Sequence, residues 1–388
     1  MNKLAIVETI MTDFSKRTCI TDGSCEPKRY LWTDAFAVCN FLELYRQTGK
    51  MQYREEALML VGQVHHVLGK HRSDDSRSGW ISGLGEDEAE AHPTIGGLRI
   101  GKARNERKEH EPQNERLEWE QDGQYFHYLT KWMHALNLVT EETEDPKYNC
   151  WALELAKTAY ERFSYETPYG TRRMYWKMSI DLSYPLVTSM GQHGALDGYI
   201  TYLSLRRTAE RYGTLSEDLD IAAEIEGLYQ MAGTMGMDTD DPLGIGGLLS
   251  DSCILAQLNG RGEDEMLSGL LLEMLVHAGQ GIRHFLSTET LKYPAQYRLA
   301  FREFGLSIGL HGIGIIQGML EGQADTAGKK ELRSQLEVLR SYKPLQEYIE
   351  TFWLEEENQE SSTWREHLDI NAVMLATSLM PDGYLRMA

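Results

Sequence analysis

Polar residues stand at the start of apolar helical runs at several places along the chain. After His193, a Gly-flanked polar turn leads into the almost wholly apolar run Asp197–Leu205. A surface helix shows a charged face every 3.6 residues, so this pattern predicts a helix that is buried on all sides. Runs of the same form begin at Asp34, His127, Asp197, Asp251, Glu303 and Asp369. Each would place its polar group in the first helical turn, where the helix dipole and unpaired N–H groups favour a carboxylate.

Amphipathic helices alternate with these buried ones. Their apolar stripes and charged faces predict outer partners over residues 53–68, 146–163, 216–231, 263–285 and 329–353. The sixth buried helix, 367–379, has no partner after it, and the amphipathic segment 3–17 can supply one. The repetition predicts an all-α fold, a single (α/α)6 toroid over residues 1–388 whose ring is closed by the N-terminal helix.

One stretch, at about 71–118, departs from the helical pattern. It is rich in Gly and charge, and a loop of this length in a compact fold is typical of a functional lid or of a disordered segment. Residues 92–100 indicate an ordered turn and short strand, whereas 102–115 indicate solvated charge.

The run from Trp32 to Ala57, with its Tyr-Arg-Gln-Thr-Gly-Lys turn, resembles the hairpins of the six-hairpin glycosidases and of the sugar 2-epimerases. The turn Asp145-Pro-Lys-Tyr148 in the second hairpin is similar. This resemblance implies the toroid fold. It identifies no single family, and no catalytic motif carries over from it.

Charge and cysteine content restrict the environment of the chain. With 388 residues, 41% hydrophobic residues, a net charge of −20 and a pI near 5.1, the protein is globular and acidic. Nucleic acid and anionic membranes are therefore not expected as partners, since both need a basic patch. No run reaches the length of a membrane span. The odd number of cysteines without metal spacing predicts reduced thiols and, with no apolar leader, a cytoplasmic protein.

Carboxylates at the first turns are the candidates for catalysis. Paired acids facing one another across a cavity are what glycoside hydrolysis requires. The candidate catalytic residues are Asp122, Asp197, Glu118, Asp34 and Asp369. Glu118 and Asp122 would share a face if their helix starts early, and a hydrogen-bonded acid pair there would raise one pKa. For each acid the simple alternative is a helix cap, and Asp251 is the best case of a pure cap.

Aromatic, histidine and basic residues near these turns are the candidates for substrate binding. Trp and Tyr faces stack on sugar rings, and gathered cations would favour an anionic sugar. The candidates are Trp32, His92, Arg99, Tyr125, His127, Trp176, Lys177, His193, Arg298, Glu303, His311 and His367.

Two further motifs bear on the chemistry. The sequence Asp238-Thr-Asp240-Asp241 matches the D-x-D-D acid of class II isoprenoid cyclases, in which Asp240 would protonate an alkene. The histidines lack a metal-ligand spacing, so neither a metal nor another cofactor is predicted.

We therefore expect a carbohydrate-active enzyme, a glycoside hydrolase acting on a small or anionic saccharide. The alternatives are a class II-type terpene cyclase using Asp240, a sugar epimerase using His127, His193, His311 and His367 as bases, and a non-catalytic binding protein. The sequence leaves homo-oligomerisation open.

Overall fold

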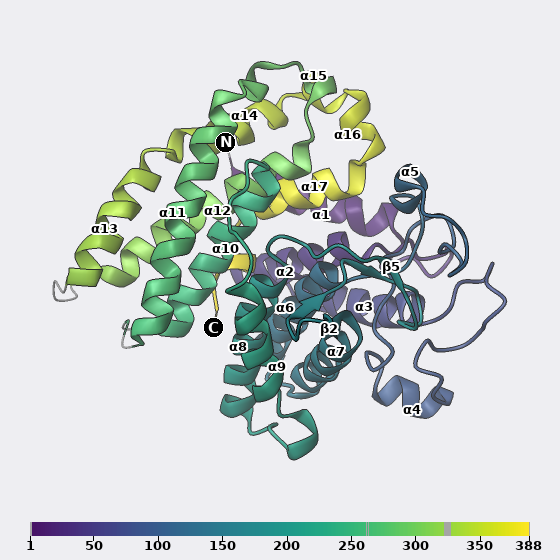
Figure 1. Cartoon of the computed structure of the whole chain (residues 1–388). Helices are drawn as coiled ribbons and strands as arrows, with labels where there is room; N and C mark the ends of the chain where they lie inside the picture. The colour runs from purple at the N-terminus through teal and green to yellow at the C-terminus, as the bar shows by residue number, and fades with distance from the viewer. Residues whose placement is uncertain (1, 261, 263, 322–326, 388) are drawn as a thin grey trace. The chain divides into compact units, whose positions relative to one another are not determined.

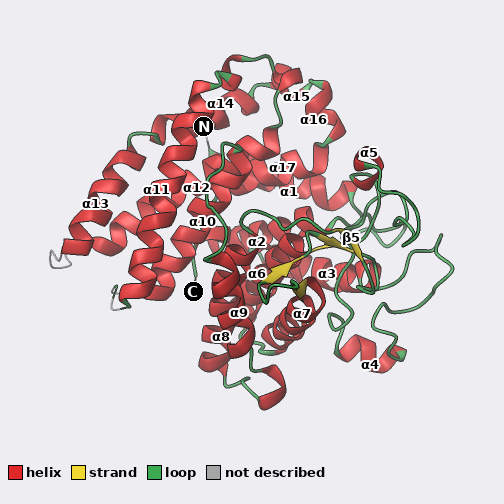
Figure 2. Ribbon diagram, in the orientation of Figure 1, coloured by secondary structure: helices red, strands yellow, loops and turns green. Residues whose placement is uncertain are grey.

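The fold is all-α, as predicted, and its helices are arranged in consecutive hairpins (Figures 1 and 2). A computed structural model describes residues 2–260, 262, 264–321 and 327–387. These residues fall into two compact units, which we call the N-terminal unit (residues 15–235) and the C-terminal unit (residues 1–14 and 236–387). Each unit is described by itself below. The closed six-hairpin ring and the single domain over 1–388 stay predictions.

Three helical hairpins form the N-terminal unit. They pair α2 (Leu31–Thr48) with α3 (Met51–Leu68), α6 (Phe126–Thr143) with α7 (Lys147–Phe163), and α8 (Gly194–Tyr212) with α9 (Ala222–Ala232). The first member of each pair is the apolar helix that the sequence predicted. α2 also packs on α6, and α6 packs on α8, so α6 is the middle one of the three. Left-handed glycines end α2 and α8, at Gly49 and Gly213, where a residue without Cβ adopts this conformation at little cost.

Short strands and the long loop lie between these hairpins. The strands β1 (Gln124–Tyr125), β4 (Lys177–Met178) and β5 (Pro185–Val187) form an antiparallel sheet in which Tyr125 pairs with Lys177. The strands β2 (Ser164–Glu166) and β3 (Arg172–Met174) form a hairpin. The loop contains only α4 (Glu86–Ala91) and α5 (Glu115–Glu118).

The long loop is packed onto the unit, and the short strand expected within residues 92–100 does not form. Leu98 and Ile100 are fully buried, and Ile100 exchanges backbone hydrogen bonds with Leu31 and Gly123 without forming a strand. Residues 103, 104 and 108–114 are exposed, as expected for solvated charge, whereas the side chains of Glu106 and Arg107 are largely buried because both have charged partners described below.

The C-terminal unit is also built from paired helices, of which α11 and α12 are the longest. It contains α10 (Pro242–Asn259) paired with α11 (Glu265–Ser287), α12 (Ala300–Leu320) paired with α13 (Ala327–Arg340) and α14 (Lys343–Leu354), and α17 (Leu368–Leu379). Short helices α15 (Glu356–Gln359), α16 (Ser362–Glu366) and α18 (Asp382–Leu385) complete it. The predicted outer helix 329–353 is thus two helices, separated at Ser341–Tyr342.

The N-terminal helix α1 (Lys3–Arg17) contributes its residues up to Phe14 to the C-terminal unit. Its expected pairing with the last buried helix stays a prediction. Val7, Met11 and Phe14 are buried, and Lys3 pairs with Glu350 of α14 at 2.8 Å.

The predicted start of the fourth buried helix is wrong. The helix begins at Pro242, and its N-cap is Asp241, whose side chain accepts a hydrogen bond from the N–H of Gly244. Asp251 therefore lies in the middle of α10, where it cannot be a cap. The Pro-Leu-Gly-Ile-Gly-Gly sequence forms the first turns of the helix.

The cysteine prediction is wrong for two residues. Cys19 and Cys25 form a disulfide, whereas Cys39, Cys150 and Cys253 are free. No helix among the described residues has the length and apolar character needed to cross a membrane.

Candidate functional site

The first turns of three buried helices meet in the N-terminal unit. The ring of Trp32, in the first turn of α2, lies 5.2 Å from that of Tyr128, in the first turn of α6. Asp197, in the first turn of α8, accepts a hydrogen bond from Thr130 of α6. The start of α6 therefore lies between the starts of α2 and α8, in the common register that the sequence predicted.

Six rings gather at this point and form what we call the aromatic cluster: Tyr30, Trp32, Tyr125, His127, Tyr128 and Trp176. The ring of His127 is at the centre, with centroid distances of 4.9 Å to Tyr128, 5.1 Å to Tyr125, 5.4 Å to Trp176 and 6.1 Å to Trp32. The hydroxyls of Tyr30 and Tyr128 are 2.8 Å apart. Trp32, Tyr125, His127 and Trp176 were expected from the sequence. Tyr30 and Tyr128 were missed, although both flank predicted residues.

The imidazole of His127 is uncharged at neutral pH. Burial lowers its pKa to about 4, and the nearby Lys131 acts in the same direction, while Asp197 opposes the shift. A neutral imidazole can donate one hydrogen bond and accept another, but it is a weak base at pH 7.

Asp197 is a buried carboxylate held beside this ring. Lys131 Nζ lies 2.7 Å from its Oδ1, and the Thr130 hydroxyl donates to its Oδ2 at 2.5 Å. Both partners come from the first turns of α6, so the carboxylate is fixed against the helix that carries His127. Lys131 and Thr130 were not predicted. The signal that could have found Lys131 is a lone cation one turn after His127 in an otherwise apolar helix.

Asp34 lies in the first turn of α2 and ties that helix to its entering loop. Its Oδ2 accepts from the backbone N–H of Tyr30 at 2.9 Å, and Arg29 Nη1 is 3.4 Å from its Oδ1. Asp34 and Arg29 are both buried. These contacts stabilise the start of α2, which is the structural role expected for Asp34 if it is not catalytic.

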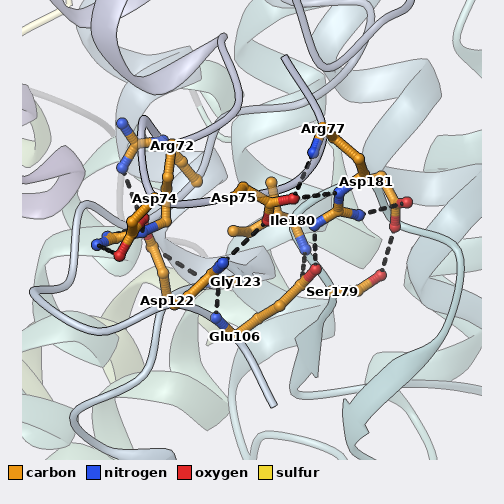
Figure 3. A network of polar contacts seen from close by, with 12 residues as sticks. Arg72, Asp74, Asp75, Arg77, Glu106, Asp122, Gly123, Ser179, Ile180 and Asp181 are labelled. Carbon is orange, nitrogen blue, oxygen red and sulfur yellow. Dashed lines mark hydrogen bonds and ion pairs between the residues drawn. The ribbon is translucent and has the colours of Figure 1, made fainter. Parts of the chain in front are cut away.

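The acids and cations of the long loop form a separate network (Figure 3). Asp122 is fully buried, and its Oδ1 accepts from the N–H groups of Gly101 and Gly123. Its Oδ2 binds Arg99 at 2.9 Å and Arg72 at 3.3 Å. Arg99 also donates to the carbonyls of Val67 and Lys70. Asp122 and Arg99 therefore both hold the long loop in place.

Glu118 and Lys177 are paired with each other. Lys177 Nζ donates to Glu118 Oε1, to the Glu118 carbonyl and to the Gln121 carbonyl at 2.8–2.9 Å, which occupies all three of its donors. Burial lowers the pKa of Lys177 despite this partner. The other oxygen of Glu118 binds Arg107 at 3.2 Å.

The expected acid pair of Glu118 and Asp122 is therefore wrong. α5 ends at Glu118, so the two acids share no helix face, and each is neutralised by its own cations. Arg99 and Lys177, expected to bind an anionic sugar, are engaged in the same way. Lys102, whose ammonium lies 5.1 Å from the Tyr30 ring centroid, is a cation beside the aromatic cluster that was not predicted.

A second part of the network joins the loop to the turn after β4. Arg77 binds Asp75 at 2.9 Å, Asp181 at 2.7 Å and Glu106 at 2.5 Å (Figure 3). Glu106 also accepts from the backbone N–H of Ile180. Burial raises the pKa of Glu106, whereas hydrogen bonds from Arg77 lower that of Asp75.

Two predicted residues of the C-terminal unit form a closed, buried pair. Arg298 contacts both oxygens of Glu303, at 2.8 and 2.6 Å, and Trp353 Nε1 donates to the same carboxylate. The guanidinium also lies 3.7 Å from the ring centroid of Phe352. Both charges are thus compensated within the helix packing.

The predicted histidines are dispersed. His311 lies in the middle of α12 and binds Glu350 of α14 at 3.0 Å. His367 is the N-cap of α17, two residues before Asp369. His193 is the N-cap of α8. His92 binds Glu154 of the outer helix α7 at 2.6 Å.

Asp240 is a surface residue. Its side chain is 60% exposed, with His284 at 3.9 Å. An acid that protonates an alkene must be shielded from water, so this position does not suit the cyclase chemistry. The D-x-D-D sequence has a structural explanation, since its last residue, Asp241, caps α10.

Comparisons with known proteins add little. No protein-family model matches the chain, and no curated protein sequence matches it. A solved structure of an unsaturated glucuronyl hydrolase with the saccharide dGlcA-Glc-Rha-Glc covers 100% of this chain and 99% of its own, at 14% sequence identity and a TM-score of 0.40.

Proposed function

We propose that the chain is a carbohydrate-active enzyme of the glycoside hydrolase type, with its site at the aromatic cluster and Asp197. The observation that carries this proposal is the buried Asp197 carboxylate, fixed at 2.7 Å from Lys131 and close to a group of six rings. A glycosidase site combines aromatic faces with a pair of carboxylates, and Asp197 would be one of that pair.

The roles follow from the chemistry of each group. Trp32 and Trp176 would stack on a sugar ring, and neutral His127 would bind one of its hydroxyls. Asp197, paired with Lys131 at 2.7 Å, would act as the base or nucleophile. Asp34, in the first turn of α2 on the other side of α6, is our candidate for the second carboxylate. The remaining predicted acids, Glu118, Asp122 and Asp369, are assigned no catalytic role.

Two of the alternatives have less support. An epimerase would need His127 as a base, and a pKa of about 4 makes it a poor one at neutral pH. A cyclase would need a shielded Asp240, whereas that side chain is exposed. A non-catalytic saccharide-binding protein would use the same rings without needing the Asp197 carboxylate.

The test is a turnover and binding screen with neutral and uronate-containing oligosaccharides. Uronates are included because the Lys102 ammonium, beside the aromatic cluster, could pair with the carboxylate of a uronate. We expect Asp197→Asn to lower turnover by roughly 10²–10⁴-fold while saccharide binding persists, and Trp32→Ala to weaken binding. Asp240→Asn, at an exposed position, is the matched control and should keep full activity.

The outcomes distinguish a glycoside hydrolase from a non-catalytic saccharide-binding protein. Lys131→Gln breaks the ion pair but keeps the carboxylate, so it should lose much less activity than Asp197→Asn. Saccharide binding without turnover would support the binding protein. Turnover unaffected by Asp197→Asn would overturn the proposal.

A further inference from the structure

A second cluster of side chains that could bind a ligand lies elsewhere in the N-terminal unit, where α4 meets α3. Glu86 and Glu90 are four residues apart on α4, so their side chains share one face. His66, near the end of α3, is close to both. One ligand atom from each of the three lies within 4.8 Å of the others.

The orientation of His66 is fixed by its backbone. Its Nδ1 lies 3.1 Å from the carbonyl oxygen of Gly62, one turn earlier in α3. A carbonyl can only accept, so Nδ1 carries the proton, and Nε2 of the neutral ring presents a lone pair. A histidine whose other nitrogen donates to a carbonyl is the usual form of a metal ligand.

That lone pair points at another acceptor. Nε2 lies 3.4 Å from Glu90 Oε1. Two acceptors at this distance repel each other, and a cation between them, either a proton on Nε2 or a metal ion, relieves the repulsion. Ligand atoms about 2.1 Å from a tetrahedral zinc ion lie about 3.4 Å apart, so the spacing fits a shared ion.

Glu86 is held in place by neighbours that partly neutralise it. Lys70 Nζ lies 2.6 Å from its Oε1, and Trp80 Nε1 donates to its Oε2 at 2.9 Å. Glu86 is therefore expected to be the weakest of the three ligands, and Lys70 competes with a metal for its charge.

We propose that His66, Glu86 and Glu90 form a binding site for a divalent transition-metal ion, with zinc as the reference ion. One imidazole and two carboxylates suit Zn²⁺ and disfavour Mg²⁺ and Ca²⁺, which prefer oxygen ligands alone. Such a site links α4 of the long loop to α3. It is independent of the proposed function.

The site also borders a cavity. A pocket of about 130 Å³ is lined by His66 and Glu90 together with Trp80 and Trp151. Three protein ligands leave a position on a tetrahedral ion for water or another small ligand. The ligands come from two segments joined by a loop, which is why the sequence showed no metal spacing.

The test is titration of the full-length, untagged and chelator-treated protein with zinc chloride, followed by calorimetry and by thermal unfolding. We expect one saturable site per chain and a rise in Tm. His66→Ala and Glu90→Gln should weaken binding at least tenfold. Glu86→Gln should have a smaller effect, and Lys70→Met should tighten binding by removing the competing ammonium.

The control is the pair His92 and Glu154, whose nitrogen and oxygen are 2.6 Å apart. It belongs to no such group of three ligands among the described residues, so His92→Ala should bind zinc like the wild type. Cobalt(II) should give a tetrahedral absorption band that is lost in His66→Ala. No saturable binding by the wild type, or binding that His66→Ala and Glu90→Gln leave unchanged, would overturn the proposal.

Discussion

A Cβ atom placed on Gly246 would lie 2.0 Å from the carbonyl oxygen of Gly305. Helices α10 and α12 therefore meet backbone to backbone. Gly309 repeats the contact one turn later, because its Cβ would lie 2.6 Å from the carbonyl oxygen of Gly246. No side chain fits between the two helices at these positions.

Gly246→Ala should therefore destabilise the protein. The added methyl group meets backbone atoms that cannot move without separating α10 from α12, so we expect a loss of about 2–4 kcal/mol in the free energy of unfolding. Urea unfolding followed by circular dichroism measures it. The neighbouring Gly247 has no atom within 4 Å of its Cβ position, and Gly247→Ala should stabilise by about 0.5–1 kcal/mol. Equal effects of the two changes would contradict the close contact.

Asp122→Asn should be one of the most damaging single changes in the long loop. It leaves Arg72 and Arg99 without their shared carboxylate, and removing one partner of a buried ion pair costs about 3–5 kcal/mol. Asp240→Asn, at an exposed site, should change stability by less than about 0.5 kcal/mol. Thermal unfolding of both variants decides this, and a small effect of Asp122→Asn would show that the network contributes little.

Stability should decrease as the pH falls below about 6.5. Burial lowers the pKa of His127 to about 4 and that of His65 to about 3, from 6.5 in the unfolded chain. Over this range the unfolded state gains protons that the folded state does not, so each histidine lowers stability by up to ~1.4 kcal/mol per pH unit. The effect is absent above the unfolded value.

The comparison of wild type with His127→Gln isolates one of these protons. Between pH 6.5 and 5, the unfolding free energy of the variant should depend less steeply on pH than that of the wild type. The difference in slope should approach the value for one proton, ~1.4 kcal/mol per pH unit. Acids with a lowered pKa, such as Glu350, add their own loss only near and below pH 4.5. Identical slopes would mean that His127 is protonated normally in the folded state.

Removal of the disulfide should cost a moderate amount of stability. Cys19 and Cys25 are six residues apart, and closing a loop this short restricts the unfolded chain by about 2 kcal/mol. The double change Cys19→Ser and Cys25→Ser should lower the unfolding free energy by that amount. Cys150→Ser, at a free cysteine, is the control. Intact mass before and after reduction shows whether the bond forms.

The result also bears on location. Disulfides are typical of oxidising compartments, so a stable Cys19–Cys25 bond would count against the cytoplasmic location predicted from the sequence. That location stays a prediction.

The helices could largely be read from the sequence because burial on all sides leaves a long apolar run. α8 begins one residue after His193, as expected, and α17 begins one residue after His367. The start of α10 was missed for a physical reason. Its glycines at 244, 246 and 247 resemble a loop locally, and Gly246 is needed only because α12 approaches there.

Part of the aromatic cluster could be predicted because the local sequence shows which residues stand in the first turn of a helix. Trp32 and His127 follow from it once helices start in register, whereas Tyr125 lies just before α6 and Trp176 lies between β3 and β4. The pairing of charges could not be predicted in this way. Asp122 lies 50 residues from Arg72, and Glu118 lies 59 from Lys177, so only the folded loop reveals that these groups neutralise each other.

The buried ion pairs of the long loop determine how the protein should respond to ionic strength. Dissolved ions screen charges in water but act weakly on pairs that water does not reach, such as Lys177 with Glu118. The repulsion among surface carboxylates of a chain with a net charge of −20 is screened much more strongly. Salt should therefore relieve this repulsion and spare the buried pairs, so we expect the protein to resist unfolding better in concentrated salt than in dilute buffer.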